Sequence, residues 1–384
     1  TRVIDGVESS NPITVIKDIY TNPVYGLGRS ETEMNLPELD ELEGLYGVSG
    51  AGMPEFHGSF DQRGTGYDAM QSVASLTGSR IIQDGGLLTV VPDKQRDVRT
   101  AVFSTGNIIR DTLSIIYTFD VSDDFDGVQI EYRNPISFDP ELAFYPADVE
   151  PTNPDTYTLF GCTDETYAKQ FAEYLWNVRS RRRKVVKLNT ELEGLIPRFG
   201  DRIGVSHPMP NWGQSGVMVR QIDAVTWMVD QNLDWTANNI MVLRDEHGLA
   251  SVEYSVTQGA TPNIVVFAAP PTETVSDQLL REPTNYMFGV ADSVMRDFII
   301  EKVTPSGDTT VEITGQTYDE LIYEGAPPHM GPLVAEPYLV AIKAIVEKGS
   351  NGFVYILNNH GIDETAFANN ASTFGSPTIG RAPF

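Results

Sequence analysis

Cysteine is nearly absent from this sequence of 384 residues, and its scarcity excludes two kinds of site. With Cys162 alone, the chain has no intrachain disulfide framework and no metal site built from several thiolates. We expect Cys162 to pack as a small apolar side chain. Long apolar runs are also missing, since none approaches the roughly 20 residues of a membrane-spanning helix. The sequence therefore predicts no membrane-spanning segment.

Positive charge is scarce as well. The chain has 27 Lys and Arg against 53 Asp and Glu, a formal net charge of −26. Such a balance disfavours binding to DNA or to anionic membranes, which requires clustered cations. It favours solubility and repulsion of a passing polyanion. The hydrophobic content of 41% is ordinary for a globular protein and argues against long disordered regions.

Motifs for catalysis and cofactor binding are missing too. No phosphate-binding loop is present, and Gly26-x-Gly28 lacks the third glycine of a dinucleotide fingerprint and follows a helical pattern. The histidines lie far apart in sequence, at positions 57, 207, 247, 329 and 360. We expect each to have a surface or capping role. The sequence thus predicts no catalytic residue, no cofactor, no metal ligand and no enzyme.

Two acidic patterns each leave two interpretations open. Glu191 and Glu193 are predicted on one face of a strand, either as a solvated face or as a glycosidase-like carboxylate pair. The segment Asp120–Gly127 half-matches a calcium-binding loop, but Arg133 stands where the bidentate glutamate belongs. That segment is predicted as a turn between strands, with a weak Ca²⁺ site as the alternative.

Helices dominate the expected structure of the first hundred residues. Asn11 and Pro12 have the residue types of an N-cap and a first helical position, and Asn22-Pro23 ends that helix. Two further helices are predicted at Leu36–Leu45 and Tyr67–Leu76, the latter ended by Gly78. Strands Ile81–Ile82 and Leu87–Val91 then flank Asp84-Gly85-Gly86, which is typical of a hairpin turn.

The clearest single element is a long helix at Asp164–Arg183. Its apolar side chains recur with helical spacing and predict one buried stripe, with Glu173 outside it. The stripe consists of Tyr167, Phe171, Tyr174, Leu175 and Val178. The helix ends in the basic run Arg179–Lys184, where cations favour the negative end of the helix dipole. We expect this run to pair with local acids; binding of nucleic acid or an acidic partner is the alternative.

Beyond this helix the sequence favours short strands separated by Gly, Asp and Pro, as in a barrel or sandwich. The predicted strands before the helix are Leu113–Phe119 and Val128–Tyr132, and those after it are Val185–Glu193, Arg202–Ser206, Gly216–Ile222, Thr226–Val229, Ile240–Leu243, Ser251–Val256, Ile264–Phe267, Phe298–Val303 and Thr310–Ile313. The predicted fold class is α+β and β-rich, with tube-like barrel or sandwich domains and a smaller helix-containing domain. We predict a helix-rich subdomain with a hairpin at 1–100, β-domains with one long helix at 101–325, and an extension or arm at 326–384.

Several phrases along the chain, in order, carry a family resemblance. They are Thr21–Gly28, Phe56–Phe60, Asp84–Asp93, Phe103–Ile108, Val128–Pro135, Gly161–Glu165, Phe199–Val205 and Tyr318–Tyr323. Over about residues 11–325 the sequence resembles the central region of the tail tip attachment protein J family of lambda-like siphophages. That family is related to the baseplate hub proteins of phages and gene transfer agents.

The resemblance implies a structural virion protein at the phage tail tip. It implies a homotrimeric hub that ends the tail tube, supports host attachment and lets DNA pass during ejection. The implied partners are other copies of the chain, the distal tail protein, tail tube and tape measure proteins, and receptor-binding or fibre components, with DNA only in transit. The alternative function is a carbohydrate-binding or glycan-cleaving β-domain, for which Trp212, Trp227 and Trp235 could supply a stacking platform.

Overall fold

The chain forms two compact units, residues 1–332 and 333–384. The computed structural model describes residues 2–4, 7–47, 52–60, 64–117, 125–210, 212–245, 248–276, 283–291, 293–331, 345–348 and 354–357. In the second unit, strands β20 (Ile345–Lys348) and β21 (Val354–Leu357) pair antiparallel. The domain boundaries near residues 100 and 325 stay a prediction.

The described residues contain four α-helices, all in the first unit. They are α1 (Pro12–Thr21), α2 (Leu36–Tyr46), α3 (Gly66–Leu76) and α4 (Glu165–Arg181). Helix α1 begins as predicted, because the side chain of Asn11 accepts from the N–H of Ile13 at 2.9 Å and Pro12 follows. After α3, Gly78 has a φ of +64°, which ends the helix as predicted. None of the helices in the described part of the chain is long and apolar enough to cross a membrane.

Helices α1 to α3 share a hydrophobic core with a hairpin and with α4. The hairpin pairs β3 (Ser79–Asp84) with β4 (Leu87–Pro92) around Gly85 and Gly86, whose φ angles of +56° and +89° match the predicted tight turn. Before α1, β1 (Arg2–Ile4) pairs with β2 (Val7–Ser9). A short 3₁₀ turn, η1 (Glu31–Glu33), precedes α2.

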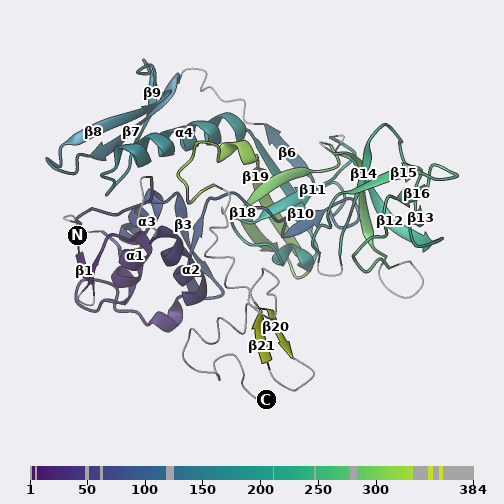
Figure 1. Cartoon of the computed structure of the whole chain (residues 1–384), viewed down its shortest axis with the longest axis horizontal. Coiled ribbons are helices and arrows are strands. Elements are labelled where there is room, and N and C mark those ends of the chain that lie inside the picture. The colour runs from purple at the N-terminus through teal and green to yellow at the C-terminus, as the bar shows by residue number, and fades with distance from the viewer. Residues whose placement is uncertain are drawn as a thin grey trace, which may run out of the picture. The chain divides into compact units, whose positions relative to one another are not determined.

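Helix α4 packs on one face of a three-stranded sheet, as Figure 1 shows. The sheet has the order β8 (Pro140–Tyr145), β7 (Gly127–Arg133), β9 (Pro154–Thr158). Tyr167, Phe171 and Tyr174 of α4 are buried in the shared core, and Leu175 and Val178 pack against it. The predicted apolar stripe is confirmed.

A six-stranded sheet forms the second core of this unit. Its order is β5 (Ala101–Phe103), β11 (Arg202–Val205), β18 (Arg296–Ser306), β19 (Thr310–Thr317), β10 (Lys184–Thr190), β6 (Ser114–Tyr117). Two 3₁₀ turns flank it in sequence, η3 (Leu192–Leu195) after β10 and η4 (Glu320–Ile322) after β19. Alternate residues of β10 and β19 are buried, so one face of each strand packs in this core.

A closed six-stranded barrel lies between β11 and β18 in the sequence (Figure 1). Its order is β12 (Gln214–Gln221), β13 (Thr226–Val229), β16 (Ile264–Phe267), β15 (Tyr254–Gln258), β14 (Asn239–Leu243), β17 (Asn285–Val290). Large side chains such as Trp227, Phe267 and Phe288 form its core. The barrel is therefore packed rather than hollow. The chain leaves the sheet at Val205 and re-enters it at Arg296, and these two residues pair directly.

The β-rich α+β fold class with a barrel is confirmed, but several element limits were wrong. The strand predicted at Val185–Glu193 ends at Thr190, because Gly194 packs against Thr190 and Val311 in a 3₁₀ turn. The strands that were not predicted are β1, β2, β5, β8, β9, β17, β20 and β21. Their sequences are short or begin at proline and asparagine, which weakens the strand pattern.

Candidate functional site

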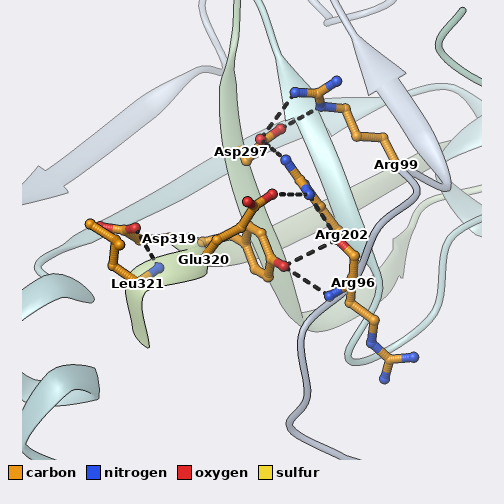
Figure 2. Close-up of polar contacts among 8 residues, drawn as sticks. Arg96, Arg99, Arg202, Asp297, Asp319, Glu320 and Leu321 are labelled. Carbon is orange, nitrogen blue, oxygen red and sulfur yellow. Dashed lines mark hydrogen bonds and ion pairs between the residues drawn. The ribbon is translucent and has the colours of Figure 1, made fainter. Parts of the chain in front are cut away.

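Two clusters of paired charges join segments that are distant in sequence. The first is centred on Asp297 of β18 (Figure 2). Arg99 donates from Nε to Asp297 Oδ1 at 2.7 Å, and Arg202 of β11 donates to Oδ2 at 2.6 Å. Arg202 also donates to Glu320 at 3.0 Å and lies over the ring of Tyr318, 4.5 Å from its centroid. The cluster thus ties β11, β18 and η4 to the segment before β5.

The second cluster surrounds Asp93, directly after β4. Its carboxylate accepts from Arg182 at 2.5 and 2.8 Å and from the hydroxyls of Tyr174 and Tyr323 at 2.6 Å each. Burial alone would raise the pKa of Asp93. The charge of Arg182 and the hydrogen bonds from Arg182 and the two hydroxyls lower it by more, so the pKa lies below its ordinary value. A carboxylate held by four donors is a structural anion, not a proton acceptor for catalysis.

Three arginines of the basic run at the end of α4 pair with acids of the chain, as predicted. Arg179 pairs with Asp155 of β9, and Arg181 pairs with Asp319 at 3.0 Å. Arg182 belongs to the Asp93 cluster. These three pairs fix the end of α4 to its neighbours.

The carboxylate pair that was weighed for Glu191 and Glu193 does not form, and the calcium-loop alternative at Asp120–Gly127 stays a prediction. Glu191 precedes η3 and Glu193 lies within it, where it pairs with Arg244 of the barrel region at 2.5 Å, so the two do not share a strand face. Most of the Asp120–Gly127 segment lies outside the described residues. Asp126 accepts from the backbone N–H groups of Thr152 and Asn153 at 2.7 and 2.8 Å. Over the described part of the chain, no three metal-ligating side chains lie close enough to share an ion.

One histidine differs from the predicted surface role. His329 is 2% exposed and lies between the rings of Tyr46 and Tyr167. Its Nε2 is 3.2 Å from the carbonyl oxygen of Thr77, and its Nδ1 has no hydrogen-bond partner. Burial lowers the pKa of His329 to about 4, so the ring is neutral at pH 7. His207 accepts from the N–H of Met209, the capping role that was predicted, and His247 and His360 lie outside the described residues.

His329 makes a specific pH dependence of stability testable. Its pKa is lower folded than unfolded, so the unfolded chain takes up the proton first as the pH falls below 6.5. We expect wild type to lose about 3 kcal/mol of unfolding free energy between pH 7 and pH 4, relative to a His329→Gln variant. Glutamine keeps an N–H donor for Thr77 but does not titrate. Urea denaturation of both proteins across this range measures the effect; parallel pH profiles would contradict it.

A groove of about 1330 Å³, lined by both polar and apolar side chains, lies near α1 and α3. Its exposed walls are Tyr25, Leu27, Phe60 and Phe138, which we call the apolar groove residues. Tyr25, Phe60 and Phe138 are 55%, 46% and 58% exposed. Exposed aromatic side chains gathered around a hollow are typical of a protein interaction surface.

Local backbone contacts hold these walls in place. The segment after α1 folds back on the helix, since the N–H of Leu27 donates to Ile19 at 2.8 Å and the Tyr25 hydroxyl donates to Asp18. A Cβ on Gly26 would overlap the carbonyl oxygen of Ile19, so glycine is required there. Phe138, in the turn between β7 and β8, has a φ of +59°, a conformation rare for a bulky residue.

The phrases Thr21–Gly28 and Phe56–Phe60, remote in sequence, thus form one surface. Comparison with known sequences connects the chain to a phage protein. It is 26% identical over 222 residues to a tip attachment protein J of Escherichia phage SECphi27. The resemblance to tip attachment protein J is confirmed. The match covers 52% of this chain and 18% of the phage protein, so the chain spans less than a fifth of that relative. No model of a known protein family matches the chain.

Two distant neighbours among solved structures are also phage-tail or gene-transfer-agent proteins. A tail protein from Neisseria meningitidis MC58 has a TM-score of 0.33 and 12% identity, covering 71% of this chain and 60% of that one. A chain of the native gene transfer agent virion has a TM-score of 0.37 and 9% identity, covering 68% and 40%.

The three tryptophans do not form a sugar-stacking platform. Trp212 is 5% exposed and packs with Phe298 in the core of the six-stranded sheet. Trp227 is buried in the barrel, and Trp235 packs on Phe288. The groove and the Asp93 cluster were not predicted as sites, because their members lie far apart in sequence. The two phenylalanines of the Phe56–Phe60 phrase, of which Phe60 is exposed, were the signal that could have found the groove.

Proposed function

We propose that the chain is a structural component of the phage tail tip and forms a homotrimeric hub without catalytic activity. The observation that carries this proposal is the 26% identity over 222 residues to tip attachment protein J. In this role the hub ends the tail tube and supports host attachment. It contacts the distal tail protein, the tail tube and tape measure proteins, and the receptor-binding or fibre components.

The described residues support a structural role by the way their polar groups are used. The carboxylate of Asp93 accepts hydrogen bonds from arginine and tyrosine, and that of Asp297 accepts them from two arginines. These bonds connect segments that are distant in sequence. The lone cysteine is 2% exposed, and burial raises the pKa of its thiol to about 12, so Cys162 is not a reactive nucleophile. These are features of a rigid building block.

The packed barrel also bears on the path of DNA. Because side chains fill its interior, DNA does not pass through one barrel, and we place the path at the axis between copies. A net charge of −26 suits such a channel, since acidic side chains near the axis repel phosphate and prevent adhesion. In the assembled hub, acidic side chains should outnumber basic ones along the axis.

Two measurements test the hub. Light scattering of the purified chain should give the mass of three copies, and an image reconstruction of the tail tip should show threefold symmetry with the chain in place. The reconstruction also identifies the side chains nearest the axis, whose charges can be summed. A chain that stays monomeric and is absent from virions would overturn the proposal.

A further inference from the structure

A pocket of about 460 Å³ lies between α2, the β3–β4 hairpin and the loop before β11. We call it the Lys94 pocket. Its volume falls within the roughly 300–1,000 Å³ that is usual for small-molecule sites. Charged groups line it together with apolar side chains, which are Leu42, Ile82, Val90, Val91, Ile196 and Phe199. The pocket therefore offers both charge and apolar contact to a ligand.

Two cations of this pocket, Lys94 and Arg96, have no carboxylate within ion-pair distance among the described residues. Arg96 donates from Nη2 to the carbonyl oxygen of Pro92 at 3.1 Å, and its buried Nε has no hydrogen-bond partner there. The pKa of Lys94 lies below its ordinary value, first because of burial and then because of the nearby charge of Arg96. Glu41 and Asp97 act in the opposite direction, each by less. An anion near both cations would offset their repulsion.

The backbone of Arg96 is held by the cluster around Asp297, while its side chain points elsewhere. Its N–H donates to the hydroxyl of Tyr318 at 2.8 Å, and its carbonyl oxygen accepts from Arg202 at 2.7 Å. Figure 2 shows the guanidinium of Arg96 turned away from Asp297. The point from which this cation extends is therefore fixed in advance, which lowers the entropy cost of binding a ligand.

A buried hydroxyl in the same pocket also has no partner. Thr89 of β4 is 3% exposed, and its Oγ1 makes no hydrogen bond with the described residues. Its strand neighbours Leu88 and Val90 are buried in the core shared by the helices, so the side chain of Thr89 lies on the other face of the hairpin, at the pocket. A buried hydroxyl without a partner costs free energy, and an anionic oxygen would satisfy it.

The carboxylates that also line the pocket are largely used within the chain. Arg198 pairs with Glu38 and Asp84 at 3.6 and 3.1 Å. Its backbone N–H donates to Asp201 at 2.8 Å, and Glu41 is exposed on α2. These acids would repel a long polyanion, and they disfavour a doubly charged phosphate more than a singly charged carboxylate.

We propose that the Lys94 pocket binds one carboxylate group carried on an apolar body. A carboxylate has enough acceptor sites for the guanidinium, the ammonium and the hydroxyl together, and the apolar lining suits the rest of the ligand. The site lies within one copy of the chain and does not depend on the proposed trimer. Two sources carry such a group, a free small acid and the carboxyl end of a polypeptide.

Titration calorimetry of the purified full chain at pH 7 separates these sources. The probes are hexanoate for a free acid and N-acetylleucine for a polypeptide end, with hexanamide and N-acetylleucinamide as uncharged controls. Each carboxylate that binds should bind about tenfold or more tightly than its amide, because the amide makes no charge-assisted hydrogen bond. Hexanoate alone would identify a free acid, and N-acetylleucine a polypeptide end. The proposal is overturned if neither carboxylate binds better than its amide, or if inorganic phosphate binds more tightly than both.

Variants locate the binding. Arg96→Gln and Lys94→Gln should each weaken carboxylate binding by about tenfold or more. Lys169→Gln removes the same charge from an exposed position outside the pocket and should leave the affinity unchanged. Thr89→Val should weaken binding by about fivefold without lowering the melting temperature, since the hydroxyl has no partner to lose. Equal affinities for the Lys94, Arg96 and Lys169 variants would refute the site.

Discussion

The free energy of unfolding of an Asp93→Asn variant should be about 3–5 kcal/mol lower than that of wild type. The substitution keeps the shape of the side chain but removes its charge, so the guanidinium of Arg182 loses its counter-ion in a site where its side chain is 10% exposed. The hydroxyls of Tyr174 and Tyr323 lose a charged acceptor at the same time. Urea denaturation at neutral pH measures the loss.

The matched control is Asp40→Asn on α2. Asp40 pairs with Lys17 at 2.5 Å, but its side chain is 67% exposed, so the change should cost no more than about 1 kcal/mol. The difference in unfolding free energy between wild type and the Asp93→Asn variant should also depend on pH. Because the folded pKa of Asp93 is depressed, its stabilisation is complete above the ordinary value of 3.8 and is lost as the pH falls through the folded value. Equal losses for the two variants would refute the role given to Asp93.

A Phe171→Ala variant should also lose about 3–5 kcal/mol of unfolding free energy, for a different reason. Phe171 is buried in the core between α4 and its neighbours, and its ring contacts those of Tyr167 and Tyr174 with centroids 6.0 and 5.5 Å apart. Truncation removes these contacts and leaves a cavity that the surrounding helices cannot fill. Thermal or urea unfolding followed by circular dichroism measures the change.

Lys169→Ala on the same helix is the control for Phe171. Its side chain is 50% exposed and pairs with Glu165 one turn away, so its loss should stay within about 0.5 kcal/mol. Glu173 is outside the apolar stripe, but it is not a neutral site. It lies against Gly325, and burial raises the pKa of its carboxyl. If the Lys169→Ala and Phe171→Ala variants had the same melting temperature, the assignment of the buried face would be wrong.

Local patterns were enough to predict the elements that are stabilised locally. Asn11 and Pro12 start α1, Gly78 ends α3, and Thr226–Val229 and Ile264–Phe267 have the strand limits that were predicted. Each of these depends on a cap, a glycine conformation or an alternating pattern within a few residues. Strand β9 was missed because it pairs in parallel with β7, a long-range partner that its Pro154–Thr158 sequence does not reveal.

The sites were less accessible to sequence reasoning than the elements. Arg179, Arg181 and Arg182 of the basic run pair with acids of the chain, as predicted, because acids are abundant in the sequence. Which acid each arginine meets depends on tertiary packing, and Asp93 and Arg182 are 89 positions apart. His329 was misjudged for the same reason, since its burial between Tyr46 and Tyr167 comes entirely from distant segments.

The way the chain enters and leaves the barrel makes that barrel a replaceable module. Val205 at the end of β11 and Arg296 at the start of β18 are direct partners in the sheet, so both ends of the intervening chain start from one place. Such a junction sets no limit on the size of what is inserted, because the register of the sheet is fixed by the two strands themselves. A gene that exchanged the barrel for another domain, or for a short turn, would need to cover the apolar cluster that Val102 forms with Val242 and Met287, and to replace the Glu193–Arg244 pair and the Thr105–Ser215 hydrogen bond.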